Sequence, residues 1–186
     1  KSIVAFVPAV SAPLPDPKKP DTSELLLAGK TVEEYPKLWL YVPFSADADT
    51  DAKLKFLMSN SRAEHVIEPI IFELPTNPGI VSITLPTSQP GLQYGEAYSW
   101  TVELRCMNQE DEPLSQTVSG FITRAEHTRD IQTTADYIDH LKQGFWYDVV
   151  HHLFSSQQQS SYLSDFLSYF ELGAVEPDVV GELVPE

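Results

Sequence analysis

Apolar and polar residues alternate along several short stretches in the first two thirds of the chain. The clearest stretch is YSWTVELRC, residues 98–106, in which every second residue is apolar and the residues between are polar. A period of two places these two sets on opposite faces of a β-strand, so one face is expected to be buried. Related patterns occupy residues 37–42, 53–59, 65–74, 80–86 and 116–124. Short strands separated by turn residues predict an antiparallel, immunoglobulin-like β-sandwich.

The period changes to about 3.6 residues after Arg124, as in an amphipathic helix. Apolar stripes run through residues 131–141 and 146–153, with Gly144 between them, and a third stripe covers residues 163–170. Glycine commonly follows the last turn of a helix, so this pattern predicts a short helical hairpin and a third helix. Helices this short are marginal alone, and we expect them to pack on the sandwich. The predicted fold class is therefore mainly β, and α+β as a whole.

The chain divides into four segments on these patterns. Residues 1–23 are predicted to be a short strand followed by a proline-rich, poorly hydrogen-bonded connector, and residues 24–125 the sandwich. Residues 126–173 carry the helical hairpin and third helix, and residues 174–186 an extended acidic tail.

The charge of the chain narrows the range of partners. A formal net charge of −15 argues against nucleic acid and against anionic lipid surfaces, both of which need clustered Lys and Arg. No apolar run approaches the ~20 residues that cross a bilayer, so no transmembrane segment is expected. Cys106 is the single cysteine, which excludes an intrachain disulfide.

Three aspartates, Asp47, Asp49 and Asp51, form a candidate calcium site in the loop after residues 37–42. An EF-hand loop requires glycine at its sixth position and glutamate at its twelfth, where this chain has Ala52 and Met58. A solvated turn between two strands is the favoured interpretation, and calcium remains the alternative.

The predicted hairpin supplies candidate binding residues on its outer face, namely Tyr147, His151 and His152. Adjacent helical residues point about 100° apart, so the two histidines diverge and do not form a zinc site by themselves. A protein partner is the expected ligand of this face.

Trp39 and Tyr41 lie on one face of their strand, opposite Leu38, Leu40 and Val42. If that face of the sheet is open, the two rings are candidates for binding a carbohydrate or a protein. If the helices cover it, both rings belong to the core.

Sequence signatures of catalysis are missing from the chain. It contains no G-x-S-x-G nucleophile elbow, no glycine-rich phosphate loop and no H-E-x-x-H pair. We therefore expect a non-enzymatic protein without a cofactor.

Several motifs occur in an order that resembles a known family: AFVP at residues 5–8, YPKLWLYVPF at 35–44, PGIVSITLP at 78–86, LQYGEAYSWTVELRC at 92–106, VSGFITR at 118–124 and QGFWYDVV at 143–150. The order is similar to that of the largely cyanobacterial domain of unknown function 928. The resemblance implies a β-sandwich followed by a helical hairpin, an exported precursor, and no established activity. The residues 141–154 are also similar to a single tetratricopeptide unit, a helix pair used for partner binding. The expected function is a protein-binding or structural module at the cell envelope, in the periplasm or on the cell surface, with a calcium-dependent or carbohydrate-binding sandwich as the alternative.

Overall fold

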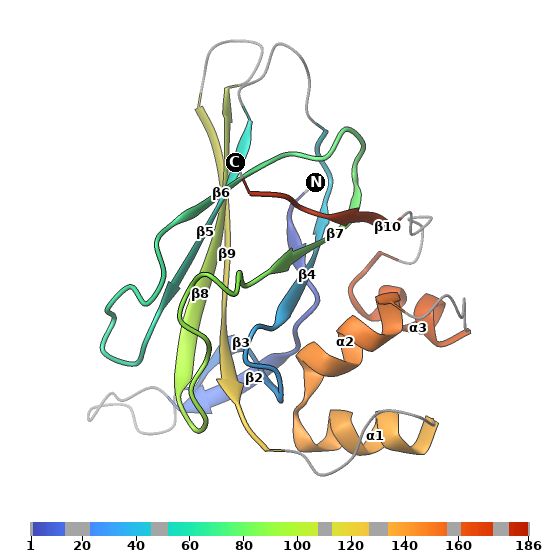
Figure 1. Cartoon of the computed structure of the whole chain (residues 1–186). Coiled ribbons are helices and arrows are strands. Elements are labelled where there is room, and N and C mark those ends of the chain that lie inside the picture. Colours follow the sequence, from blue (N-terminus) through green and yellow to red (C-terminus); the bar gives the residue numbers. More distant parts are fainter. Residues whose placement is uncertain are drawn as a thin grey trace.

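The computed structural model describes residues 2–13, 23–45, 52–107, 113–126, 134–155, 161–172 and 179–185. They contain ten strands and three helices (Figure 1): β1 Val4–Ala5, β2 Ala9–Pro13, β3 Ser23–Thr31, β4 Lys37–Val42, β5 Lys53–Ser59, β6 Ile70–Glu73, β7 Gly79–Thr84, β8 Ala97–Met107, β9 Pro113–Arg124, α1 Thr134–Gln143, α2 Trp146–Ser155, α3 Ser161–Tyr169 and β10 Val179–Glu182. The protein is mainly β, as the alternating pattern predicts. None of the described helices is both long and apolar enough to span a membrane.

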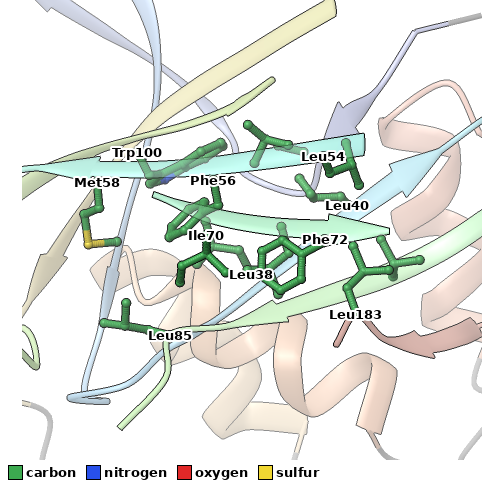
Figure 2. Close-up of a cluster of buried hydrophobic side chains, with 14 of the residues drawn as sticks. Leu38, Leu40, Leu54, Phe56, Met58, Ile70, Phe72, Leu85, Trp100 and Leu183 are labelled. Atoms are coloured by element: carbon green, nitrogen blue, oxygen red, sulfur yellow. The ribbon is translucent and has the colours of Figure 1, made fainter. Parts of the chain in front are cut away.

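The strands form two sheets that pack face to face. One sheet has the order β1-β4-β7-β10 and the other the order β2-β3-β9-β8-β5-β6. Side chains from both inner faces meet in one buried cluster, and Figure 2 shows Leu38 and Leu40 of β4 close to Phe56 of β5 and Phe72 of β6. Because every second residue of strands such as β8 is buried between the sheets, apolar and polar residues alternate along their sequences.

Helices α2 and α3 form a third layer on the outer face of the four-stranded sheet, and α1 packs against α2 (Figure 1). A second apolar cluster joins Phe6, Trp39 and Ile80 on the sheet side to residues of α2 and α3, among them Val150 and Phe154. The prediction that the short helices pack on the sandwich is confirmed. The outer face of the six-stranded sheet carries polar residues, as the pattern of β8 predicts, with Phe121 partly exposed among them.

The strand order matches that of an immunoglobulin-type sandwich, in which strands A, B, E and D form one sheet and strands C, F and G the other. In chain order, β1, β4 and β7 take the positions of A, B and E, while β5, β8 and β9 take those of C, F and G. Tyr98, at the start of β8, forms a tyrosine corner: its hydroxyl oxygen accepts a 3.0 Å hydrogen bond from the backbone N–H of Gln93. The immunoglobulin-like prediction therefore holds for these strands.

Two strand pairs depart from the purely antiparallel prediction, which is wrong for them. Strand β3 runs parallel to β9, and β10 runs parallel to β7, so both sheets are mixed. Each parallel pair joins segments far apart in the chain, a feature that local alternation does not encode.

Three strands, namely β2, β3 and β10, lie where the sequence predicts none. Strand β2 falls inside residues 8–23, predicted as a poorly hydrogen-bonded connector, yet it pairs with β3 over five residues. Strand β10 falls inside the predicted acidic tail and completes the four-stranded sheet. Two segments predicted to lie outside the sandwich, the connector and the tail, therefore contribute edge strands.

Candidate functional site

Trp39 and Tyr41 lie beneath the helices. Each is 7% exposed, and Trp39 packs on the Phe154 ring at a centroid distance of 5.0 Å. The helices cover this face of the four-stranded sheet, so both rings are core residues and not an open carbohydrate platform. The Nε1 donor of Trp39 is buried without a hydrogen-bond partner among the described residues.

Tyr147 fixes α2 to the six-stranded sheet. Its hydroxyl accepts a 2.7 Å hydrogen bond from Trp100 Nε1 and donates a 2.9 Å hydrogen bond to the Phe121 backbone oxygen. Burial raises the pKa of Tyr147 well above its usual value. The prediction that Tyr147 lies on the outer face of the hairpin is wrong, because the ring points into the sandwich and is 3% exposed.

Asp148 fixes the same helix to the end of β3. One carboxylate oxygen accepts a 2.7 Å hydrogen bond from Thr31 Oγ1, and the other accepts a 3.0 Å hydrogen bond from the backbone N–H of Val32. Burial raises the pKa of Asp148 to about 6, although both hydrogen bonds favour the charged form. Sequence reasoning missed this role; the only local signal is a carboxylate in the first turn of a helix.

His151 and His152 point in different directions, as helical geometry predicts. The His151 ring stacks on Trp39 at 6.2 Å, and its Nδ1 lies 3.0 Å from Ser155 Oγ. The His152 ring meets Tyr137 of α1 edge-on at 5.2 Å. Burial and the nearby Lys37 lower the pKa of His151. Both histidines are partly exposed, and the residues that the structure describes hold no group of three metal-ligating side chains.

A polar cluster surrounds β10 near His151. Lys37 Nζ of β4 lies 2.8 Å from Glu182 Oε2 of β10, and Thr84 of β7 donates a hydrogen bond to the other carboxylate oxygen. The hydrogen bond from Lys37 lowers the pKa of Glu182. The next residue, Leu183, points the other way into the main core (Figure 2) and is 8% exposed. Two adjacent residues therefore have different environments, one ionic and one apolar.

Strand β10 occupies the place of strand D, beside the strand equivalent to E. Residues 74–78 lead directly from β6 to β7, so this place is filled by a segment from the far end of the chain. The parallel pairing shifts register between Val179 and Gly181, where Gly181 has a φ of 121°. After it, Leu183 N donates a 2.9 Å hydrogen bond to Ser82 O, and Pro185 bridges to Phe72 of the other sheet. We call β7 and the side chains of Lys37 and Thr84 the strand-accepting edge.

A second surface feature is an aromatic cluster between α2 and α3. Trp146 stacks near Phe166 and Tyr169, and Tyr169 meets Phe170 edge-on at 5.1 Å. Tyr169 is 64% exposed, so this cluster reaches the surface.

The predicted metal residues Asp47, Asp49 and Asp51 lie outside the described residues. The calcium hypothesis for this loop stays a prediction.

The fold of the chain and its strand-accepting edge define a class of protein: an immunoglobulin-like sandwich module with a helical layer, in which a C-terminal strand completes the smaller sheet. A family model described as Domain of Unknown Function (DUF928) matches residues 1–176, and the chain belongs to this family. No curated protein and no solved structure matches the chain.

Proposed function

We propose that the protein is a non-enzymatic module that binds other proteins at the cell envelope, by accepting an extended segment of the partner as a strand beside β7. One observation carries this proposal: the strand position next to β7 is not supplied by the adjoining chain but by the remote segment Val179–Glu182. Sheet edges of this kind recognise extended peptides through main-chain hydrogen bonds, with side-chain sockets for specificity.

The groups around the strand-accepting edge support peptide recognition. They comprise the ammonium of Lys37, the hydroxyl of Thr84 and an apolar socket that takes Leu183. His151, one of the residues predicted to bind a partner, is partly exposed and close enough to Lys37 and Glu182 for their charges to act on its pKa. Hydrogen bonds of Tyr147 and Asp148 attach α2 to the six-stranded sheet and to the end of β3, which favours a preformed site over one assembled on binding.

The envelope location, in the periplasm or on the cell surface, is part of the proposal. It rests on the exported precursor that the family resemblance implies. Fractionation of cells that produce the tagged natural protein tests it.

A reversible lock tests strand acceptance. Ser82 and Glu182 are Cα partners in neighbouring strands, which lie ~5 Å apart, so cysteines at both positions suit a disulfide. The double variant Ser82→Cys/Glu182→Cys is titrated into a fluorescein-labelled peptide of residues 177–186, and binding is followed by anisotropy. Oxidation should hold the protein's own strand in place and prevent peptide binding, and reduction should restore it.

Two controls make the result specific. The single variant Ser82→Cys should respond to the peptide equally in oxidising and reducing buffer, because it cannot form the lock. Equal binding by the locked and unlocked double variant, or no binding by either, would refute strand acceptance at β7.

A further inference from the structure

The bound state of residues 179–185 shows which chemistry the edge recognises. Glu182 is held by Lys37 at 2.8 Å and by Thr84, and it reaches them from the face of the sheet that bears the helices. Leu183 enters the core from the opposite face. An extended segment with a carboxylate followed at once by a large apolar side chain therefore satisfies both environments, because successive side chains of a strand point to opposite faces.

The strand-accepting edge lies inside the region that matches the family model, and the strand that covers it, β10, lies outside that region. Lys37 and Thr84 lie within the matched residues 1–176, whereas β10 begins after them at Val179. Strand β10 is also short, and its pairing with β7 shifts register at Gly181. A segment held by few main-chain hydrogen bonds and one ion pair at the surface is easier to displace than a central strand.

We infer that the strand-accepting edge binds a partner segment in which an acidic residue precedes a large apolar residue, and that residues 179–185 compete with it as an intramolecular occupant. This inference rests on the function proposed above and adds the chemistry of the partner and its regulation. A different protein is favoured over a second copy, because a net charge of −15 on each copy opposes their association.

The test uses the full chain with its own occupant weakened. The double variant Glu182→Ala/Leu183→Ser, called the released variant, keeps Lys37 and the β7 edge intact. Its affinity for the labelled peptide of residues 177–186 is compared with that of the unchanged chain. The unchanged chain should bind at least about tenfold more weakly, because its own segment occupies the edge most of the time.

Changes in the peptide test the two recognition elements. A peptide with Glu182→Lys should bind the released variant about tenfold more weakly, because it loses hydrogen bonds to a charged group. A peptide with Leu183→Ser should lose roughly thirtyfold, because it gives up the burial of one large apolar side chain.

A charge exchange tests contact with Lys37. In the released variant, Lys37→Glu should weaken binding of the natural peptide and restore binding of the Glu182→Lys peptide. Lys55→Glu is the matched control, because Lys55 lies on β5 in the other sheet, and it should leave both affinities unchanged.

The outcomes separate this inference from the proposed function. Equal affinity for all peptides would leave strand acceptance standing and overturn the acidic–apolar specificity. Equal binding by the released and unchanged chains would overturn intramolecular competition. Sedimentation should show a monomer for both chains; a dimer of the unchanged chain that is lost in the released variant would identify a second copy as the occupant and overturn a separate partner.

Discussion

Asp148 makes the attachment of the helical layer sensitive to pH. Its carboxylate accepts hydrogen bonds from Thr31 and Val32, yet burial outweighs them and raises its pKa from 3.8 to about 6. The nearby charge of Glu33 also raises this pKa, while His140 lowers it. A raised pKa means that the folded protein binds the proton more tightly than the unfolded chain does. The charged carboxylate therefore reduces stability above about pH 6, and this loss disappears as the pH falls toward 3.8.

The size of the effect follows from the two pKa values. A difference between 3.8 and about 6 corresponds to ~3 kcal/mol in the free energy of unfolding across the full range. Asp148→Asn removes the charge but keeps an oxygen that accepts from Val32 and an amide that donates to Thr31 Oγ1. Relative to this variant, the natural chain should gain ~2 kcal/mol of stability between about pH 7.5 and pH 4.5.

Urea unfolding, followed by tryptophan fluorescence at several pH values, measures this difference directly. The difference in unfolding free energy between Asp148→Asn and the natural chain cancels the contributions of the titratable groups that both chains share. Asp165→Asn, at an exposed position of α3, corrects for the removal of one negative charge from an acidic protein. A stability difference between Asp148→Asn and the natural chain that stays constant over this pH range, or that changes in the opposite direction, would refute the desolvation argument.

Three further predictions concern other parts of the molecule. Tyr147→Phe leaves the buried Trp100 Nε1 without its acceptor, and urea titration should show a loss of ~1–3 kcal/mol; unchanged stability would contradict the role of this hydroxyl in docking α2. Gly120→Ala would place a methyl group 2.5 Å from the Trp100 ring, so the unfolding free energy should fall by ~1–3 kcal/mol, as thermal or urea unfolding can measure. If the aspartate loop binds calcium, the ion should raise the melting temperature of the natural chain and not that of Asp49→Ala, and equal shifts in both would remove that hypothesis.

The parts of the fold that sequence predicts are those in which burial is local and periodic. Strand β8 alternates without interruption because its inner residues, such as Trp100 and Val102, are fully buried while its outer residues face solvent. Strand β3 was not predicted, because its sequence SELLLAGKT has an apolar run and a glycine in place of alternation. The close approach of Gly29 to Tyr147 explains that glycine, but the reason lies in a residue far along the chain.

The candidate site was less predictable for the same physical reason. The sequence marks Trp39 and His151 as candidate binding residues. It does not predict that their rings stack, because that depends on which face of the sheet the helices cover. Tyr147 was assigned to the wrong side of its helix, because hydrophobic periodicity alone does not distinguish a tyrosine that bonds a buried indole from one at the surface. Tertiary hydrogen bonds such as Trp100–Tyr147 and Thr31–Asp148, which join residues 47 and 117 positions apart, leave no local signature.

The strand-accepting edge depends on topology and not on any motif. The turn between β6 and β7 is too short to contain another strand, so the immunoglobulin order reaches β7 with its outer neighbour missing. An uncovered β7 would expose a row of main-chain donors and acceptors, which is a liability that folded proteins avoid. Some extended segment must therefore cover it, and residues 179–185 do so with one charged and one apolar anchor. Because the main-chain requirement can be met by any strand, the proposed function predicts that those two anchors decide which segment binds beside β7, and that substitution of Lys37 is the most direct way to alter partner choice.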